Sequence, residues 1–128
     1  MMSQIERIQG IGNQGPYAQG VRVGDWVYTS GQIPMVPTTG LVLTGPITIQ
    51  APQVFANLQA VLAECGADLT QVVKVTVYLT DLADFAQFNE VYAQVFATDR
   101  PARACVQVAA LPRGVAVEVE AIAYTGRV

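Results

Sequence analysis

Strict alternation of side chains in two segments near the C-terminus, residues 101–106 and 115–123, constrains the fold more than any other feature of the sequence. Alternate side chains of a β-strand point to opposite faces of its sheet. In the second segment, the valines and alanines at odd-numbered positions therefore share one face, and Glu118 and Glu120 share the other. The first segment alternates in the same way around Arg103. Both segments are predicted to be strands of a sheet that buries one of its faces.

The connector between these segments, residues 110–114, contains a proline and a glycine, as is typical of a turn. The sequence therefore predicts an antiparallel hairpin. In that hairpin Arg103 faces Glu118 or Glu120, depending on the register, and the thiol of Cys105 lies beside them. Taken alone, this pattern is interpreted as a cross-strand ion pair, which is common on the surfaces of sheets.

Two other stretches, residues 47–64 and 82–96, have the apolar spacing of amphipathic helices. Pro52 favours the first turn of a helix, so the regular part of the first helix is predicted to begin near Ala51. Asp81 precedes the second helix and is predicted to cap it through its side chain.

Further strands are predicted at four places along the chain: residues 4–9, 21–23, 26–30 and 71–80. Together with the helices they predict one domain over residues 1–128, an α+β fold with a single mixed sheet. Both helices are expected to pack on the valine face of that sheet. The face that carries Arg103 and Glu118 is then expected to stay open.

The surface of such a domain is thinly charged. Apolar residues make up 52% of the chain and charged residues only 13%, whereas about 25% is usual for charged residues. No apolar run reaches the ~18 residues of a membrane helix, so no membrane association is expected. The composition instead indicates that part of the surface is buried between subunits of a homo-oligomer.

Charge and residue content exclude several functions. The formal net charge is −3 and the basic residues are scattered, which argues against a nucleic-acid partner. The chain has no histidine, which excludes Ser-His-Asp and Cys-His catalysis and histidine-based zinc sites. No spacing indicates a metal or cofactor. Cys65 and Cys105 are expected to be reduced thiols of a cytoplasmic protein without a signal peptide, although a bridge between them stays open.

Three further positions are candidates for a cleft. Tyr17 lies in a loop that Pro16 stiffens, so its ring is either a capped core aromatic or part of a cleft wall. Gly31 follows Ser30 at a predicted strand end, where a glycine permits close approach of a ligand or a bulge. Asn89 lies inside the second helix, either exposed to solvent or with its amide bonded to a neighbouring loop.

Four motifs in this order carry a resemblance that covers nearly the whole chain: Gly15–Gly20 (GPYAQG), Thr29–Pro34 (TSGQIP), Pro101–Val106 (PARACV), and Leu111–Gly114 (LPRG) followed by Val117–Ala123 (VEVEAIA). Through them the chain resembles the RidA (YjgF) family of reactive-intermediate imine deaminases. The resemblance implies a chorismate-mutase-like fold, assembled as a homotrimer with sites in the clefts between subunits. It also implies cofactor-free hydrolysis of 2-imino or 2-enamino acids, of the 2-aminoacrylate or 2-iminobutanoate type, to 2-oxo acids and ammonia.

The resemblance also assigns roles to residues. It places the family's carboxylate-binding arginine at Arg103 and its water-positioning glutamate at Glu118, and it puts other substrate-binding positions at Tyr17, Ser30, Gly31, Asn89 and Cys105. A nucleophilic role of the Cys105 thiol is disfavoured, because no histidine is present to activate it. Glu120 is expected to support Arg103.

A second function stays open beside hydrolysis. A non-catalytic, regulatory trimer that binds 2-oxo acids would use Arg103 in the same way. Glu118 favours the enzyme, because a carboxylate next to a bound anion helps chemistry and hinders simple binding. Ribonuclease activity conflicts with the acidic net charge and the missing histidine.

Overall fold

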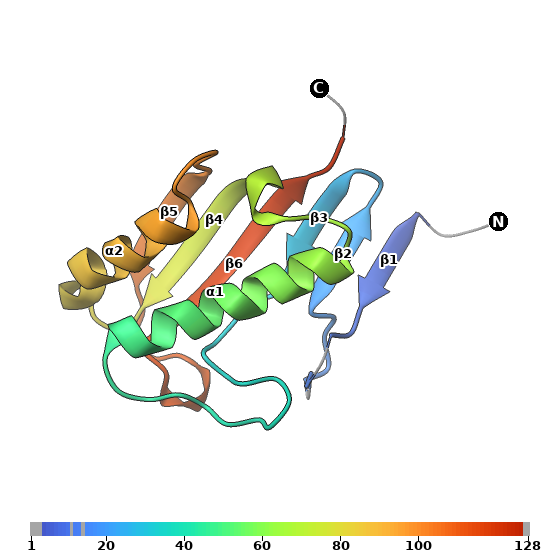
Figure 1. Cartoon of the computed structure of the whole chain (residues 1–128). Coiled ribbons are helices and arrows are strands. Elements are labelled where there is room, and N and C mark those ends of the chain that lie inside the picture. Colours follow the sequence, from blue (N-terminus) through green and yellow to red (C-terminus); the bar gives the residue numbers. More distant parts are fainter. Residues whose placement is uncertain (1–3, 11, 14, 127–128) are drawn as a thin grey trace.

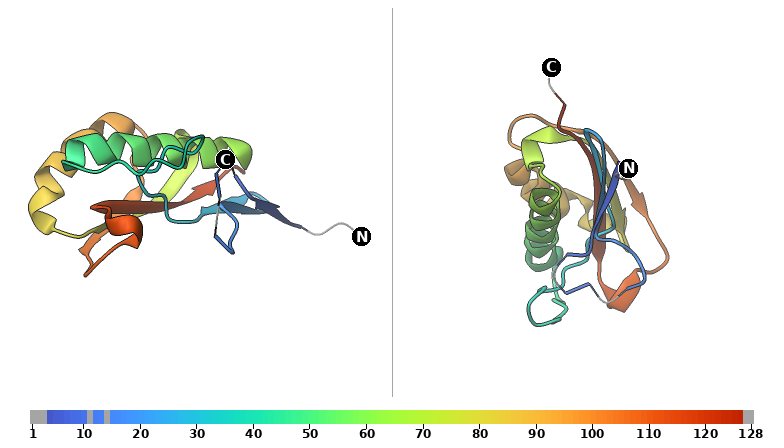
Figure 2. Two further views of the ribbon diagram at one scale, coloured as in Figure 1. Left: turned by 90° about the horizontal axis from the view of Figure 1, so that it is seen from below. Right: turned by 90° about the vertical axis from the view of Figure 1, so that its right-hand side faces the viewer.

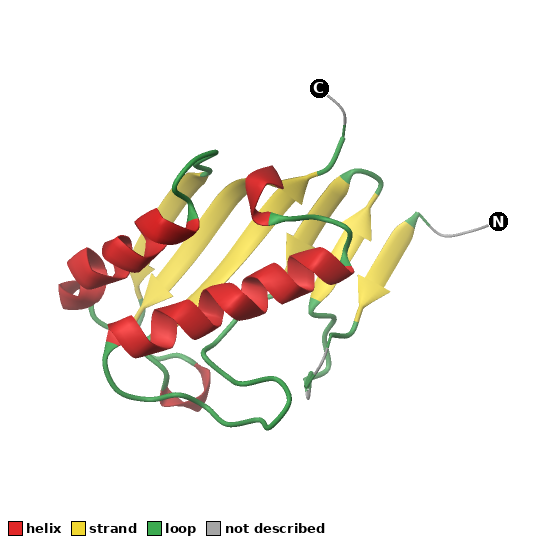
Figure 3. Cartoon of the chain, in the orientation of Figure 1, coloured by secondary structure: helices red, strands yellow, loops and turns green. Residues whose placement is uncertain are grey.

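The computed structural model describes residues 4–10, 12–13 and 15–126; the other positions of the expected domain, residues 1–3, 11, 14 and 127–128, lie outside the described set. Within that set the chain forms one six-stranded sheet with two α-helices on the same face (Figures 1 and 3). The elements follow in the order β1 (Ile5–Ile8), β2 (Gly20–Val23), β3 (Trp26–Thr29), α1 (Ile47–Glu64), η1 (Leu69–Gln71), β4 (Val72–Leu79), η2 (Leu82–Asp84), α2 (Phe85–Val95), β5 (Ala102–Gln107), η3 (Pro112–Gly114) and β6 (Val117–Tyr124).

The strand order across the sheet is β1-β2-β3-β6-β4-β5. All neighbours are antiparallel except β4 and β5, which run parallel. Parallel neighbours need a crossover connection, and α2 is that connection (Figure 1). The predicted α+β class with a single mixed sheet is therefore confirmed.

The predicted hairpin between the last two strands is wrong, because β4 lies between β5 and β6. Strands β4 and β6 are each eight residues long and alternate buried with less buried positions almost throughout. Pairing these two strands joins the longest apolar faces of the chain. The shorter β5 has exposed residues at both ends and takes the edge of the sheet. The connector at residues 112–114 forms a 3-10 turn instead of a hairpin turn.

The expectation that Arg103 and Glu118 share a face is wrong for the same reason. Val75 of β4 is the register partner of both Arg103 and Ala121. Register partners point to the same face, and Glu118 has the opposite parity to Ala121 along β6. Arg103 therefore points toward the helices, whereas Glu118 points to the open face.

The helices form a layer over one face of the sheet, as Figure 2 (left) shows, and the core lies between the two layers. The buried valines at odd positions of the two central strands are Val75, Val77, Val117 and Val119. A bulge between Val72 and Lys74 shifts the alternation at the start of β4, so Val72 is buried and Val73 is exposed. The valine face predicted from residues 115–123 is confirmed. Leu58 of α1 is 0% exposed, and its truncation to alanine would cost about 2–5 kcal/mol. Aromatic rings fill the space between α1 and α2: Phe55, Phe88, Tyr92 and Phe96.

Both predicted helices form, with shifted starts. Helix α1 begins at Ile47, not near Ala51, because Ile47 is buried and Gln50 anchors the first turn. The Gln50 side chain donates to the Gly45 carbonyl at 2.9 Å and accepts from the backbone N–H of residue 116 at 2.9 Å. The Asp81 side chain accepts from the backbone N–H of residue 83, so its predicted capping role is confirmed, although the capped turn is the 3-10 turn η2.

The open face of the sheet carries large apolar side chains. Trp26 is 42% exposed and Tyr28 46% exposed on β3, and Val106 is 44% exposed on β5.

None of the helices in the described part of the chain is long and apolar enough to cross a membrane.

Candidate functional site

The structure divides the expected site residues into two groups. The glutamate cluster, on loops and β6, consists of Tyr17, Ser30, Gly31 and Glu118. The arginine cluster, on α2 and β5, consists of Asn89, Arg103 and Cys105. A single chain does not bring the two clusters together, because Arg103 and Glu118 lie on opposite faces of the sheet.

Backbone contacts build the glutamate cluster. Gln32 and Val119 exchange two backbone hydrogen bonds, of 2.8 and 3.1 Å, which hold the segment after β3 against β6. This bridge brings Gly31 so close to Glu118 that a Cβ on Gly31 would lie 2.0 Å from Glu118 Oε2. The missing side chain of Gly31 therefore leaves room for the carboxylate of Glu118, and the approach of a ligand at Gly31 stays a prediction.

The loop of Tyr17 is tied to the same segment. The Ser30 hydroxyl donates to the Ala18 carbonyl at 2.6 Å, and the Ser30 N–H donates to the Gln19 carbonyl at 2.8 Å. The Gln32 amide donates to Gln19 Oε1 at 2.7 Å. Ser30 thus holds the loop with its hydroxyl, while the Tyr17 side chain stays 51% exposed.

The Glu118 carboxyl has an unusual electrostatic environment. Burial raises its pKa above the ordinary value, and the nearby charge of Glu120 raises it further. A carboxylate with a raised pKa holds a proton more readily, which suits a general base.

Glu120 is held by Tyr78 of β4, whose hydroxyl donates a hydrogen bond to Glu120 Oε1. The pKa of Tyr78 is raised to about 12, with this hydrogen bond as the largest cause and burial as the next. Tyr78 is also the register partner of Glu118. The expectation that Glu120 supports Arg103 is wrong, because Glu120 points to the open face with Glu118.

One face of α2 packs against the side chain of Arg103. Arg103 Nη1 donates to Asn89 Oδ1 at 2.7 Å. The guanidinium carbon lies 4.6 Å from the ring centre of Tyr92 and 5.3 Å from that of Phe85. Residues 85, 89 and 92 are spaced as neighbours on a helix surface, so a single stripe of α2 supplies an acceptor and aromatic faces for the cation.

This arrangement was only partly visible in the sequence. Asn89 binds Arg103 through its carbonyl oxygen, which neither of the two expected roles included. Phe85 and Tyr92 belong to the apolar spacing of the helix predicted over residues 82–96, and that spacing does not by itself indicate contact with a cation. The spacing of Phe85 and Tyr92 around Asn89, which places all three on one face of a helix, was the feature of the sequence that could have indicated a shared contact.

The Tyr92 hydroxyl is buried and has no hydrogen-bond partner among the described residues. Burial raises the pKa of Tyr92, and the positive charge of Arg103 acts in the opposite direction. An unpaired buried hydroxyl is costly to the folded state.

The cysteines are free thiols, so the possible bridge between Cys65 and Cys105 does not form. Burial raises the pKa of the Cys105 thiol, and Arg103 offsets this only in part. The thiol therefore stays protonated near neutral pH, which agrees with the low expectation for a nucleophilic cysteine. Within the described residues, no group of three or more cysteines and carboxylates is placed to hold a metal ion.

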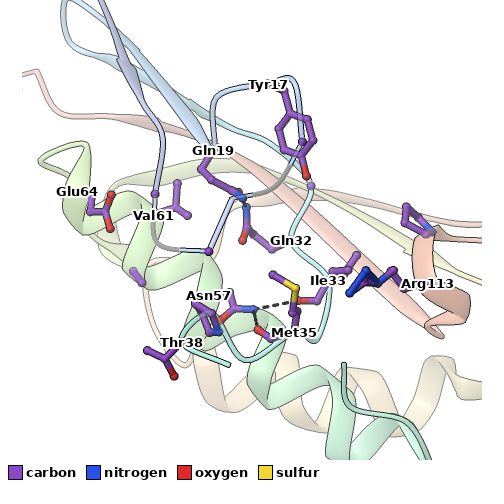
Figure 4. A pocket seen from close by; sticks show the side chains of 17 residues that line it. Tyr17, Gln19, Gln32, Ile33, Met35, Thr38, Asn57, Val61, Glu64 and Arg113 are labelled. Atoms are coloured by element: carbon purple, nitrogen blue, oxygen red, sulfur yellow. Dashed lines mark hydrogen bonds between the residues drawn. The ribbon is translucent and has the colours of Figure 1, made fainter. Parts of the chain in front are cut away.

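A cavity of about 330 Å³ adjoins the glutamate cluster (Figure 4). Tyr17 and Gly31 belong to its wall, and α1 contributes Asn57, Ala60 and Val61.

Comparison with known proteins gives the family. A family model described as Endoribonuclease L-PSP matches residues 7–125. The human 2-iminobutanoate/2-iminopropanoate deaminase is 44% identical over 130 residues, covering 98% of this chain and 95% of the human protein. The structure of the YjgF gene product of E. coli superposes with a TM-score of 0.85 at 40% identity, covering 92% of this chain and 94% of that one. This chain belongs to the RidA/YjgF family.

A second solved structure, E. coli TdcF with bound serine, superposes with a TM-score of 0.86 at 43% identity, covering 98% of this chain and 100% of that one. The six-stranded sheet with its helices on one face is thus the architecture of a RidA/YjgF chain. The four sequence motifs that carried the resemblance supply every member of the two clusters except Asn89, which comes from α2.

Proposed function

We propose that this protein is a homotrimeric deaminase that hydrolyses 2-imino and 2-enamino acids to 2-oxo acids and ammonia. The observation that carries the proposal is the division of the site. Arg103 sits on the edge strand β5, facing α2, and Glu118 sits on the open face. The reaction needs both groups, so each site would combine the arginine cluster of one subunit with the glutamate cluster of the next.

Several features support association through these surfaces. The exposed rings of Trp26 and Tyr28 lie on the open face, and the chain has an unusually low share of charged residues. Large apolar surfaces of this kind mark interaction sites. The name of the human relative and the serine bound to TdcF support a small amino-acid-like substrate.

Arg103 would bind the substrate carboxylate through its planar fork, which fixes both charge and orientation. The contacts with Asn89 and with the ring of Tyr92 hold the guanidinium in place before the substrate arrives. This preorganisation would reduce the entropy lost on binding. Backbone amides at Gly31 and Cys105 would donate to the substrate oxygens.

Glu118 would take a proton from a water molecule while the water oxygen attacks the imine carbon, and would pass that proton to the imine nitrogen, which gives a carbinolamine. Glu118 would then take the proton of the carbinolamine hydroxyl and give it to the amino nitrogen. The carbonyl of the 2-oxo acid forms as the C–N bond breaks, and ammonia leaves. Net, one imine and one water give one oxo acid and one ammonia. The raised pKa of Glu118 brings its basicity closer to neutral pH, where general bases work best.

The test uses mixed trimers. Imines generated by a threonine dehydratase are followed by release of the oxo acid. Arg103→Ala and Glu118→Gln should each abolish acceleration over buffer. Refolding the two inactive variants together in equal amounts should restore about a quarter of the wild-type activity, because that share of sites then receives an intact arginine and an intact glutamate from different subunits. No recovery would contradict a shared site.

Further measurements on the same variants distinguish this function from other functions. Tight binding of 2-oxo acids by calorimetry, without any acceleration of imine hydrolysis, would indicate the non-catalytic binding trimer. Degradation of RNA by the wild type but not by Glu118→Gln would indicate the activity in the name of the family model. The acidic net charge and the missing histidine disfavour that activity.

A further inference from the structure

Tyr78 of β4 lies beside both glutamates of the open face and has no part in the mechanism above. It is the register partner of Glu118, whereas Thr76 is the register partner of Glu120. Register partners share a face of the sheet, and an aromatic side chain also reaches its diagonal neighbour on the next strand, about 7–8 Å away. The hydroxyl of Tyr78 is therefore placed to donate to either glutamate.

The hydroxyl of Tyr78 donates to the diagonal neighbour. Its hydrogen bond goes to Oε1 of Glu120, and this bond is the largest cause that raises the pKa of Tyr78 to about 12. The phenol stays protonated, and so remains a donor, over the whole pH range in which carboxyl groups titrate. Glu120 is thus held at one oxygen throughout that range.

The Glu118 carboxylate has no such donor. Burial and the charge of Glu120 are the causes that raise its pKa, and no hydrogen bond from another described residue is among them. A hydroxyl that donated to Glu118 would stabilise its ionised form and make it a weaker base. Because Tyr78 donates to Glu120 instead, the oxygens of Glu118 stay available to a water molecule.

The other charged group near these glutamates on β4 is Lys74, which lies further along the sheet. Lys74 is the register partner of Ile122, two positions beyond Glu120 on β6. The segment after β3 brings Gly31 to Glu118, and thus no charged side chain. On the far side of β4, strand β5 presents uncharged side chains to the open face: Ala102, Ala104 and Val106. Glu120 is therefore the charge that determines the electrostatic environment of Glu118.

We propose that Tyr78 is a positioning residue of the reaction: it anchors Glu120 as a fixed negative charge and thereby leaves Glu118 free to bind the attacking water. This inference rests on the proposed function. Glu118 and Glu120 are chemically identical and occupy alternate positions of one strand. The hydroxyl makes their environments different, and pairs of titratable groups in different environments take different roles in catalysis.

The variant Tyr78→Phe tests this role, because it keeps the ring and removes the donor. Glu120 then loses its anchor and turns toward water, where solvent screens its charge. The pKa of Glu118 should fall, so the acid limb of the kcat/KM profile should move to lower pH. The movement should have the direction expected for Glu120→Gln and should not exceed the movement in that variant. The imine assay with an excess of threonine dehydratase measures the profile.

The matched control is Tyr28→Phe. Tyr28 lies on the same open face, on β3 opposite Ile122, and is 46% exposed; the loss of its hydroxyl should leave the acid limb in place. The double variant Tyr78→Phe/Glu120→Gln should move the limb no further than Glu120→Gln alone, because Tyr78 acts through that charge. An unmoved limb in Tyr78→Phe, or an additional shift in the double variant, would overturn the role of Tyr78.

A readout without turnover separates failure of this inference from failure of the proposed function. Glutamate labelled with carbon-13 at its side-chain carboxyl gives NMR signals that titrate with pH, and Glu118→Gln identifies the signal of Glu118. Its midpoint should be lower in Tyr78→Phe than in the wild type and unchanged in Tyr28→Phe. If the wild type hydrolyses no imine, the enzymatic proposal fails, and this midpoint still tests whether Tyr78 acts on Glu118. An equal midpoint in Tyr78→Phe and the wild type would overturn the inference, whatever the activity.

Discussion

The arginine cluster and the glutamate cluster position their charged groups by different means. Arg103 is held by side chains, the amide of Asn89 and the rings of Tyr92 and Phe85, all from one stripe of α2. Glu118 is held against a backbone, because Gly31 leaves room for its carboxylate. The first arrangement tolerates small shifts of the main chain, whereas the second is disturbed by them. Substitutions should therefore damage the two clusters in different ways.

Among substitutions that keep Arg103 and Glu118 themselves, the largest effect is expected at Gly31. In Gly31→Ala the new methyl would overlap the Glu118 carboxylate, which must swing away. Because the end of a glutamate side chain moves readily, the free energy of unfolding should change little. Displacement of a catalytic group by about 1 Å can cost about 100-fold in rate, so kcat should fall by about that factor. Chemical denaturation and steady-state kinetics on the same preparation check both parts; a folded variant with full activity would contradict the backbone-built cluster.

A smaller effect is expected from the helix side. Asn89→Ala removes the acceptor at 2.7 Å from Arg103 Nη1 but leaves both aromatic contacts. A hydrogen bond to a charged group contributes about 1.5–3 kcal/mol, so KM should rise by about tenfold or more, with a lesser change in kcat. Gln87→Ala, exposed on the same helix, serves as the control. If kcat fell while KM stayed constant, Asn89 would act in the chemical step and not through Arg103.

The charge of Glu120 should affect the pH profile of the reaction and not its maximum rate. Glu118 must be ionised to act as a base, so activity should rise with pH through a pKa above the ordinary carboxyl value. Glu120→Gln removes the second cause of the raised pKa of Glu118, so the acid limb of the kcat/KM profile should move to lower pH. Glu90→Gln, an exposed change on α2, should leave the limb in place. A limb that moves to higher pH in Glu120→Gln would show that Glu120 does not act through its charge.

The contrast between the clusters also explains what the sequence could predict. Alternation along residues 115–123 correctly assigned Glu118 and Glu120 to the face opposite the valines, because that periodicity is local. It could not identify the neighbour of β5, since strand order depends on pairing between distant segments. The proline and glycine of the connector favoured a hairpin, and that error placed Arg103 on the wrong face. The role of Asn89 was hidden for the same reason, because it depends on α2 packing beside the edge strand.

The smallest effect is expected at the hydroxyl of Tyr92, and it tests whether the arginine cluster is complete without substrate. This hydroxyl is buried without a partner in the described part of the chain. Tyr92→Phe keeps the ring beneath Arg103 and removes an unsatisfied group, which should raise the free energy of unfolding of the ligand-free protein by about 1 kcal/mol. Urea denaturation at fixed protein concentration measures the change. A loss of stability would mean that another subunit of the proposed trimer supplies a partner for the hydroxyl. A gain in stability together with a raised KM would indicate that the substrate is that partner.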